Sequence, residues 1–420
     1  MGADVYAELE ARGMVYQVTD ADLGAKLAAE PLTFYIGFDA TADSLHVGSL
    51  LPLMVVARLE QAGHHPIVLL GGGTTLVGDP SGKDADRPTM SPEQIEANAA
   101  GIRAQIEHIL GTEVEMVDNA EWLRELRLTD FLRDVGRHFR VNEMVAKDSV
   151  RARLERDQGI SYKEFSYMLL QAYDFLHLFE RSGCTLQVGG SDQWGNITAG
   201  IELISRRHRA QAYGLTFPLV TRSDGAKFGK SEGGNLWLDP ARTSPFQFFQ
   251  FWLRVPDADA GRYLRLFTWL PVERIEELEA AAAARPERRE VQQVLATEVT
   301  TLVHGAAATD AARRASEALY GGDLAGLDEP MLLEVFAEAP ATSAPRSELE
   351  QGLTLVDLLT RTGLVKSRSE ARTAIGQGGA YVNNRREGDP DRRLEASDLL
   401  VGSYLLLRRG KRSYHLVRFT

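Results

Sequence analysis

The chain has 420 residues, of which 44% are hydrophobic and 25% are charged, and its formal net charge is −12. This composition is typical of a globular protein with two or three domains, and it argues against a disordered chain or a protein that coats nucleic acid over its whole surface. No apolar run is long enough to span a membrane, and the first residues lack the apolar core of a signal peptide. The single cysteine, Cys184, excludes an internal disulfide and fits a reducing cytoplasm.

Charge is unevenly distributed along the chain. Residues 353–420 hold 13 Lys and Arg against 7 Asp and Glu, so this part carries +6 and leaves −18 for the rest. A small basic segment on an acidic body predicts local contact with a polyanion. The sequence contains no C-x-x-C pair and no H-E-x-x-H motif, so we expect no metal site held by the protein itself.

A polar turn near the N-terminus joins a predicted strand to a predicted helix. Residues 32–36 alternate in a strand pattern that we expect Gly37 to end, and apolar residues recur at helical spacing from His46 onward. Open α/β sheets bind nucleotides at such turns, and the N–H groups of a helix N-terminus favour phosphate. Gly48 would let a flat base lie against the backbone, and His46 can donate to a phosphate. A capped helix without a ligand is the alternative.

Two further segments precede the middle of the chain. Residues 66–71 form a continuous apolar run, which predicts a strand buried on both faces. It leads to a turn at residues 77–83 that superficially resembles a P-loop, although the required spacing is absent. A structural turn is therefore the alternative to a phosphate site. Residues 92–110 predict a helix with Ser91 as its N-cap.

The predicted helix at residues 163–181 is apolar nearly all round, which indicates burial. Tyr167, Gln171 and Asp174 nevertheless fall at i, i+4 and i+7, on one face. Burying an uncompensated carboxylate costs on the order of several kcal/mol, so this polar stripe needs partners. An internal hydrogen-bonded network or a zwitterionic ligand with a polar tip would supply them.

Two later turns carry further candidates. Residues 184–188 predict a strand, and Asp192 in the turn after it either caps the next helix or binds ribose hydroxyls. Residues 206–209 are the basic run RRHR, which is either a solvated surface or a contact to RNA phosphates. A strand predicted at residues 217–220 leads to Lys227 and Lys230 among glycines, which indicates a cationic loop or a plain surface turn.

Two of these turns resemble the signatures of one enzyme class. Residues 46–49, HVGS, resemble the HIGH signature of class I aminoacyl-tRNA synthetases, and residues 35–46, YIGFDATADSLH, resemble its form in bacterial tyrosyl-tRNA synthetases. Residues 227–231, KFGKS, resemble the KMSKS signature of the same class. The two occur in the family's order, and the resemblance covers essentially the whole chain.

The resemblance implies an α/β fold with a Rossmann-like parallel-sheet catalytic domain, an all-helical domain and a small α+β RNA-binding tail domain. The expected parts are a catalytic domain at 1–240 with a dimerisation insert at about 75–185, a helical anticodon-side domain at 241–338, a linker at 339–352 and an α-L type RNA-binding domain at 353–420.

The implied activity is tyrosine–tRNA ligation. L-Tyrosine reacts with ATP, accompanied by Mg²⁺, to give tyrosyl-adenylate and pyrophosphate, and the tyrosyl group then passes to the 3′ end of tRNA(Tyr). The implied partners are therefore tRNA(Tyr), L-tyrosine and ATP, together with a second copy of the chain in a homodimer. We expect a cytoplasmic location and no membrane contact.

The resemblance also assigns roles to residues by their position. Catalysis would rest on Thr41, His46, Lys227 and Lys230. Tyrosine would be bound by Tyr35, Asp79, Tyr167, Gln171, Asp174 and Gln193. ATP would be bound by Gly37, Asp39, Gly48, Ser49, Lys83, Arg87, Asp192 and Ser231. Transfer RNA would be bound by Arg206, Arg207, Arg368, Arg372, Arg385 and Arg386.

Some residues depart from the family's pattern, and different functions compete. The family's first signature commonly ends in His where this chain has Ser49, which makes only a shorter ribose contact, and Ile36 replaces a residue that is often a small thiol.

A tryptophan-type synthetase shares the scaffold, but an indole has no hydroxyl for Tyr35 and Asp174 to bind. A non-catalytic RNA-binding protein and a small nucleotidylyltransferase are two more candidate functions.

Overall fold

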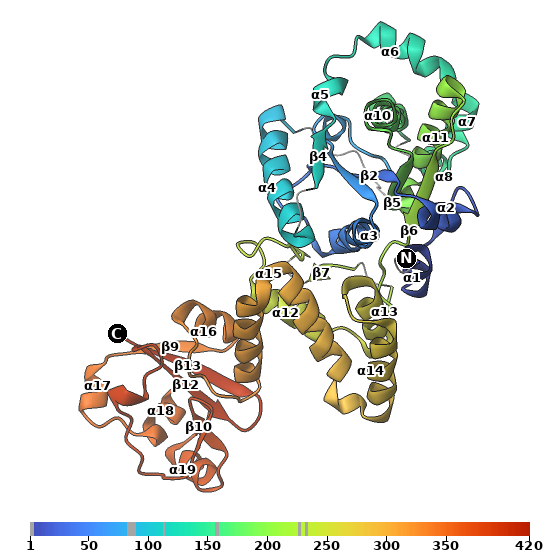
Figure 1. The fold of residues 1–420 in the computed structure, drawn as a ribbon. Helices are drawn as coiled ribbons and strands as arrows, with labels where there is room; N and C mark the ends of the chain where they lie inside the picture. The colour runs from blue at the N-terminus through green and yellow to red at the C-terminus, as the bar shows by residue number, and fades with distance from the viewer. Residues whose placement is uncertain (1–3, 82–89, 112–113, 156–158, 226–227, 232–233) are drawn as a thin grey trace. The chain divides into compact units, whose positions relative to one another are not determined.

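The computed structural model describes residues 4–81, 90–111, 114–155, 159–225, 228–231 and 234–420 (Figure 1). Lys83, Arg87 and Lys227, to which the sequence assigns roles, lie outside these ranges. The chain packs as two units, Met1–Thr243 with Trp252–Val303 and Ser244–Phe251 with His304–Thr420. Within the described ranges, we find no helix with the length and apolar character needed to cross a membrane.

The first unit is built on a six-stranded sheet in the order β1-β6-β5-β2-β3-β4. Its strands are β1 (Gln17–Val18), β2 (Thr33–Phe38), β3 (His65–Leu70), β4 (Glu115–Asp118), β5 (Leu186–Gly190) and β6 (Tyr213–Phe217). Neighbouring strands are parallel except β1, which pairs antiparallel with β6. The predicted parallel α/β sheet is therefore confirmed. From β2 the chain moves to β3 on one side, and from β5 it moves to β6 on the other, so ligand binding is expected where β2 and β5 end.

Helices cover both faces of this sheet (Figure 1). The helices α3 (Leu50–Gln61) and α4 (Pro92–Leu110) lie on one side, and α10 (Tyr167–Ser182) and α11 (Trp194–His208) lie on the other. The predicted start of α4 is confirmed, because the Ser91 side chain accepts from the Gln94 amide. The shorter elements are α1 (Val5–Ala11), α2 (Leu23–Ala29), η1 (Val47–Ser49), η2 (Thr74–Leu76), α5 (Ala120–Leu123), α6 (Leu128–Asp134), η3 (Gly136–His138), α7 (Val141–Val145), α8 (Asp148–Leu154), α9 (Tyr162–Phe165) and η4 (Ser191–Gln193).

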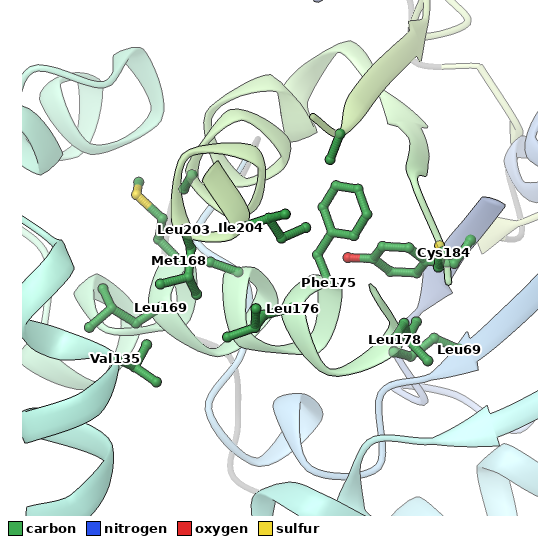
Figure 2. Packing of buried hydrophobic residues seen from close by; sticks show 14 of the residues in the cluster. Leu69, Val135, Met168, Leu169, Phe175, Leu176, Leu178, Cys184, Leu203 and Ile204 are labelled. Carbon is green, nitrogen blue, oxygen red and sulfur yellow. The ribbon is translucent and has the colours of Figure 1, made fainter. Parts of the chain in front are cut away.

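An apolar cluster between α10 and α11 fixes the face that α10 turns toward the sheet. Met168 and Phe175 of α10 pack there with Leu203 and Ile204 of α11 (Figure 2). The ring of Phe175 also lies 5.3 Å from that of Tyr35 on β2, measured between centroids. Full burial of side chains of this size stabilises a fold by about 1.5–3 kcal/mol each, so the orientation of α10 is strongly determined.

Two predicted strand boundaries are wrong. Gly37 does not end its strand, because β2 continues to Phe38 and pairs through Gly37 and Phe38 with Leu69 and Leu70 of β3. The strand predicted at residues 217–220 instead spans Tyr213–Phe217. Pairing with a buried parallel neighbour outweighs the local preference in both places.

The region expected to form one helical domain, 241–338, is divided between the two units. Its helices are α12 (Pro245–Leu253), α13 (Asp257–Phe267), α14 (Val272–Ala284), η5 (Pro286–Arg288), α15 (Glu290–Leu319) and α16 (Glu329–Val335). The end of α13 is held to the first unit by Arg58, which donates to the Thr268 carbonyl at 2.7 Å, and by Arg12, which donates to the Leu270 carbonyl at 2.8 Å. These buried arginines explain why α13 belongs with the sheet.

The second unit contains a five-stranded sheet in the order β11-β10-β12-β13-β9. Its elements after α16 are β9 (Ala341–Ala344), α17 (Ser347–Glu350), α18 (Leu355–Arg361), α19 (Arg368–Gly376), β10 (Ala380–Val382), β11 (Arg385–Glu387), η6 (Ala396–Asp398), β12 (Tyr404–Arg409) and β13 (Ser413–Phe419). β9 pairs parallel with β13, and the other neighbours are antiparallel.

The linker prediction for residues 339–352 is wrong. Residues 341–344 form β9, and the side chains of Ala344 and Leu349 are buried in the core of the second unit. Pro340 and Pro345 flank the strand without entering it, as proline does at the edge of a sheet. Prolines that resemble those of a linker here mark the two ends of an edge strand.

Ala344→Asp should destabilise the second unit. Ala344 is 2% exposed, so an aspartate there places an unpaired charge in the core, which typically costs about 3–5 kcal/mol. The matched control is Ser343→Asp, one residue earlier and exposed, which should change the free energy of unfolding by less than about 0.5 kcal/mol. Urea denaturation measures both, and equal effects of the two substitutions would restore the linker interpretation.

Candidate active site

A carboxylate and a phenol are buried together beneath the carboxyl end of β2. The carboxylate of Asp174 accepts from Asn119 Nδ2 at 2.9 Å and from Trp122 Nε1 at 2.7 Å. Burial raises the pKa of Asp174 to about 7, and the two donors oppose that rise. The hydroxyl of Tyr35 is also buried, and within the described residues it has no hydrogen-bond partner. Burial, followed by the charge of Asp174, raises the pKa of Tyr35. Tyr35 also packs against α10, the helix that carries Asp174, because its ring lies 5.3 Å from that of Phe175.

A polar network joins three of the residues predicted to bind the amino acid. Gln193 Nε2 donates to the Asp79 carboxylate at 2.7 Å, and Gln171 Nε2 donates to Gln193 Oε1 at 3.2 Å. Asn196 Nδ2 donates to the side-chain oxygens of Gln171, at 3.0 Å, and Gln193, at 3.2 Å. The amide of Ser81 also donates to Asp79, at 2.9 Å. The network therefore links α10, the turn after β5 and the turn after η2.

Tyr167 connects this network with the carboxyl end of β2. Its hydroxyl donates to Asp39 Oδ1 at 3.3 Å. Burial raises the pKa of Tyr167, and Asp39, Asp79 and Asp174 raise it further. Three carboxylates near one buried phenol make this region electronegative, which suits an ammonium group.

The first signature turn holds His46 in a defined orientation. His46 Nδ1 accepts from the Gly48 amide at 3.0 Å, so a neutral ring carries its proton on Nε2. A Cβ on Gly48 would lie 2.7 Å from His46 Cε1, and glycine is therefore required for the ring to fold back over the turn. Thr41 and His46 are exposed, and Ser49 precedes α3 without a capping hydrogen bond from its side chain.

The structure brings the second signature turn onto the first. A Cβ on Gly229 would lie 2.5 Å from Val47 Cγ1, so the two turns are in close contact. The Leu236 amide donates to the Gly229 carbonyl, and the Val47 amide donates to the Leu236 carbonyl, both at 2.8 Å. The exposed Lys230 lies in β7 (Lys230–Ser231), which pairs with β8 (Gly234–Asn235).

The other predicted nucleotide contacts lie where adjacent strands end. Gly37 and Asp39 stand at the end of β2, and Asp192 lies in η4, directly after β5. These positions match the ends of β2 and β5, where the sheet topology predicts ligand binding. Lys83, Arg87 and Lys227 are outside the described residues, as is the side chain of Ser231, so their roles stay predictions.

Each of the six arginines predicted to contact tRNA has a partner in its own unit. The pairs are Arg206–Glu143, Arg207–Glu180, Arg368–Asp357, Arg372–Asp391 and Arg385–Asp323, together with Arg386 and the carbonyls of Gln377 and Gly378. The five arginines in ion pairs are at least 38% exposed. Exposed pairs are worth about 0–1 kcal/mol, so phosphates could compete for these guanidinium groups, and the tRNA role stays a prediction.

Sequence reasoning missed several side chains of the site. Asn119 and Trp122 hold Asp174, Asn196 completes the amide network, and Thr74 donates to Asp39 at 3.4 Å. Asn119 directly follows β4, and a polar residue at the carboxyl end of a buried strand was a usable signal. Trp122 offered no comparable signal, because a tryptophan in an apolar helix reads as core.

The described residues include no group of three or more His, Cys, Asp or Glu side chains that could hold a metal ion.

Comparisons with known proteins identify the class to which this fold and site belong. The family model described as "tRNA synthetases class I (W and Y)" matches residues 27–321, and the model described as "Tyrosine--tRNA ligase SYY-like C-terminal domain" matches residues 333–417. The chain therefore has the catalytic fold of a class I aminoacyl-tRNA synthetase.

Individual relatives narrow this class. A protein of Roseiflexus castenholzii named tyrosine–tRNA ligase is 54% identical over 417 residues, which cover 98% of each chain. The chain belongs to the tyrosine–tRNA ligase family. A C-terminally truncated mitochondrial tyrosyl-tRNA synthetase of Aspergillus nidulans has 33% identity and a TM-score of 0.67, over 74% of this chain and 92% of that one. A tryptophanyl-tRNA synthetase of Encephalitozoon cuniculi shares the fold alone, with 14% identity and a TM-score of 0.55, over 73% of this chain and 86% of that one.

Asp174 should make the stability of the free protein depend on pH. Its pKa is about 7 in the folded protein and about 4 in an unfolded chain, so between these values only the folded state holds the proton. The free energy of unfolding should then fall as pH rises through this window, by on the order of 1 kcal/mol per pH unit. Asp174→Asn lacks this component. We expect the free energy of unfolding of the parent minus that of the variant, measured by urea denaturation, to fall from about pH 4 to about pH 7 and then to level off. A difference that does not change with pH would contradict the assignment.

Proposed function

We propose that this protein is a tyrosine–tRNA ligase in which Asp174 and Tyr35 recognise the phenol hydroxyl of the substrate. The reaction has two steps. The tyrosine carboxylate attacks the α-phosphate of ATP, forming tyrosyl-adenylate and releasing pyrophosphate, and a ribose hydroxyl at the 3′ end of tRNA(Tyr) then takes the tyrosyl group. The observation that carries the proposal is that Tyr35, whose buried hydroxyl has no partner among the described residues, packs against α10, which carries the buried Asp174 carboxylate.

A phenol hydroxyl complements these two groups. It can donate to the Asp174 carboxylate while accepting from the Tyr35 hydroxyl, which satisfies a buried donor that otherwise costs about 1–3 kcal/mol. Asn119 and Trp122 support this arrangement, because each donates to a different oxygen of Asp174 and leaves that oxygen able to accept from the ligand as well. Phenylalanine would give the Tyr35 hydroxyl no acceptor and would offer no donor to Asp174.

The amino and carboxyl groups of the substrate match the second part of the site. Asp79, Tyr167 and Gln171 would hold the ammonium, and Gln193, whose amide bonds Asp79, would lie near the carboxylate. The electronegative surroundings of Tyr167 support the ammonium assignment. The whole substrate would then extend from Asp174 toward the ends of β2 and β5.

The nucleotide would bind where the two signature turns meet. In this proposal the adenosine is held by Gly37, Asp39, Gly48, Ser49 and Asp192. The departing phosphates are contacted by Thr41, His46, Lys83, Arg87, Lys227 and Lys230, and Ser231 also contributes to ATP binding. Such phosphoryl chemistry needs positioning and charge stabilisation more than a nucleophile from the protein. Mg²⁺ enters as part of the ATP substrate, and no step is assigned to it.

A tryptophan-type activity is the second candidate, because the fold is common to both synthetases. An indole N–H can donate to one carboxylate, but it offers no oxygen to accept from Tyr35. The identity of Asp174 and Tyr35, and not the fold, therefore separates the two candidates. Pyrophosphate exchange into ATP with each of the twenty amino acids is the direct test, and exchange that depends on tryptophan would overturn the proposal.

The remaining partners follow from the same reaction. Arg206 and Arg207, with Arg368, Arg372, Arg385 and Arg386 of the second unit, would contact tRNA(Tyr). The proposal includes a cytoplasmic location, consistent with the single buried thiol of Cys184.

Removing the Asp174 carboxylate should weaken selection between tyrosine and phenylalanine. Tyrosyl-tRNA synthetases are the standard case of selection by a hydrogen-bonded hydroxyl, and the assignment to Asp174 is what this chain adds. We expect Asp174→Ala to lower the ratio of kcat/KM for tyrosine to that for phenylalanine by about ten-fold or more, in line with a hydrogen bond to a charged group. Pyrophosphate exchange with each amino acid measures the ratio.

Tyr35→Phe is the companion variant, because it removes one hydroxyl and keeps the ring against Phe175. It should lower the same ratio by a smaller factor. An equal loss of activity with both amino acids, in either variant, would count against the roles of Asp174 and Tyr35.

A homodimer would use the apolar surface of the insert. Leu128, Leu132, Val141 and Tyr162 are between 45% and 74% exposed, which is unusual for apolar side chains gathered in one segment. Leu128→Asp combined with Val141→Asp should shift the protein from dimer to monomer in sedimentation at micromolar concentration. Tyr320→Asp, at an exposed position of the second unit, should leave the dimer intact. A parent chain that sediments as a monomer would refute this part.

A further inference from the structure

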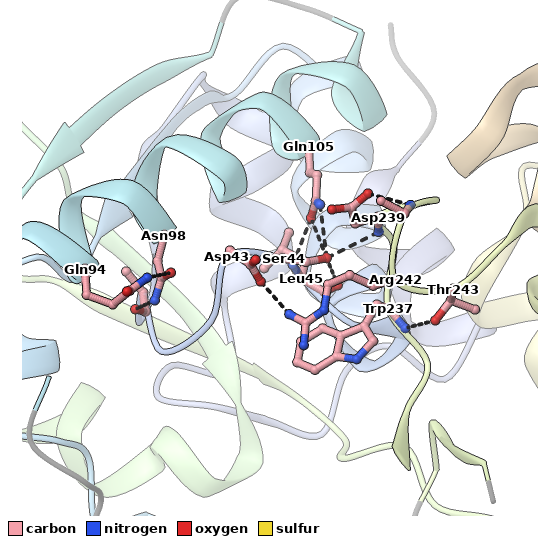
Figure 3. Close-up of polar contacts among 12 residues, drawn as sticks. Asp43, Ser44, Leu45, Gln94, Asn98, Gln105, Trp237, Asp239, Arg242 and Thr243 are labelled. Atoms are coloured by element: carbon pink, nitrogen blue, oxygen red, sulfur yellow. Dashed lines mark hydrogen bonds and ion pairs between the residues drawn. The ribbon is translucent and has the colours of Figure 1, made fainter. Parts of the chain in front are cut away.

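The connection between β2 and η1 carries Thr41 and His46, and α4 holds it near both ends (Figure 3). Asn98 Nδ2 of α4 donates to the Ala40 carbonyl at 2.9 Å, and Gln105 Oε1 accepts from the Leu45 amide at 2.8 Å. These bonds satisfy backbone groups of the residues that directly precede Thr41 and His46, the two residues proposed to contact phosphate. The position of the connection therefore depends on two amide side chains from another element.

Gln105 uses both ends of its amide group. Its Nε2 donates to Ser44 Oγ at 3.0 Å, while its Oε1 accepts from Leu45. The Ser44 hydroxyl donates to the Leu45 carbonyl at 2.7 Å and accepts from the Asp239 amide at 3.2 Å. Ser44 and Leu45 are buried, so water cannot easily replace a lost partner, and each bond matters more than it would at the surface.

The contact requires the helix and the connection to approach closely. Asn98, Gly101 and Gln105 fall at i, i+3 and i+7 and so share one face of α4. A Cβ on Gly101 would lie only 2.3 Å from the Asp43 carbonyl oxygen. Gln94 Nε2 donates to Asn98 Oδ1 at 3.0 Å and so orients the amide of Asn98. This face of α4 therefore has the close fit, the donor (Asn98) and the acceptor (Gln105) needed to hold a peptide backbone.

The opposite side of the connection is held by the segment that follows the second signature. The Leu238 amide donates to the Leu45 carbonyl at 2.9 Å. Arg242 forms an ion pair with Asp43 and lies 3.6 Å from the ring centroid of Trp237 (Figure 3). The first signature turn is thus held between α4 and the segment that follows the second signature turn. If the contacts with α4 were lost, the first turn could shift, and its contact with the second turn would be disturbed.

The apolar packing of α4 uses a different stripe of the helix from this polar face. Its buried apolar residues are Ile95, Ala99, Ile102 and Ile106, which form a separate stripe. The amides and Gly101 therefore serve the contact with residues 40–45 and not the apolar packing of α4.

We propose that Gln105, together with Asn98, is a positioning residue for the nucleotide half of the reaction. By fixing residues 40–45, the two amides place Thr41 and His46 against the phosphates of ATP. The proposal rests on the proposed function and adds to it a requirement on α4, which lies outside both signatures. Tyrosine recognition, which depends on Asp174 and Tyr35, should be independent of these amides.

The main test is Gln105→Met, which keeps the length of the side chain and removes both hydrogen bonds. We expect kcat/KM for ATP in tyrosine-dependent pyrophosphate exchange to fall about ten- to a hundred-fold, as misplacement of positioning groups by about 1 Å does elsewhere. The dissociation constant of L-tyrosine, measured by equilibrium dialysis, should change by less than about two-fold. Glu96→Met on the exposed face of α4 is the matched control and should leave both quantities unchanged.

Two further variants separate positioning from a general role in folding. Gln105→Glu keeps the acceptor for the Leu45 amide and should recover a substantial part of the lost kcat/KM for ATP. Gly101→Ala keeps every hydrogen-bonding side chain but pushes the Asp43 backbone away, and it should reproduce the loss seen with Gln105→Met.

The outcomes distinguish this inference from the proposed function. A parent chain without tyrosine-dependent exchange refutes the function itself. With an active parent, a kcat/KM for ATP within two-fold of the parent in both Gln105→Met and Gly101→Ala overturns the positioning role. Parallel losses of ATP use and tyrosine binding in all three variants also overturn it, because they indicate a general effect on the fold.

Discussion

Ionising the Asp174 carboxylate in its buried position costs free energy, and the hydrogen bonds from Asn119 and Trp122 offset part of that cost. The donors lie just after β4, whereas the carboxylate lies on α10, so the sheet, α5 and α10 must keep their relative positions for the charge to be tolerated. The apolar cluster around Phe175 provides that rigidity. Across the part of the chain that the structure describes, the Tyr35 hydroxyl has no partner, so a ligand can satisfy it. In the proposed function, the same buried carboxylate both carries this cost and selects a phenol.

The nucleotide side of the site depends on contact between segments far apart in the sequence. Gly229 lies against Val47, and the backbone around Leu236 bonds to both turns. Gln105 holds the first turn from the other side. A short, polar turn has little packing of its own, so its precision must come from the elements around it. This explains why side chains outside the two signatures matter for the signatures themselves.

Local rules predicted a large part of this structure. Helical geometry places Tyr167, Gln171 and Asp174 on one face. The Ser91 cap is a local hydrogen bond within the first turn of its helix. Both features could therefore be predicted from the sequence. The hydrogen bonds of Asn119 and Trp122 to Asp174 span 55 and 52 residues, and only the tertiary arrangement creates them. The strand at residues 341–344 was missed for the same reason, because its partner β13 lies about seventy residues later and its prolines resemble those of a linker.

A crystal structure of the protein with L-tyrosine bound would test the central claim most directly. The account predicts the phenol oxygen of the ligand within about 3 Å of both the Asp174 carboxylate and the Tyr35 hydroxyl, with Asn119 and Trp122 still bonded to Asp174. It also predicts the ammonium group of the ligand beside Asp79. A ligand whose phenol oxygen lies away from Asp174, or an Asp174 that has left its two internal donors, would contradict the account.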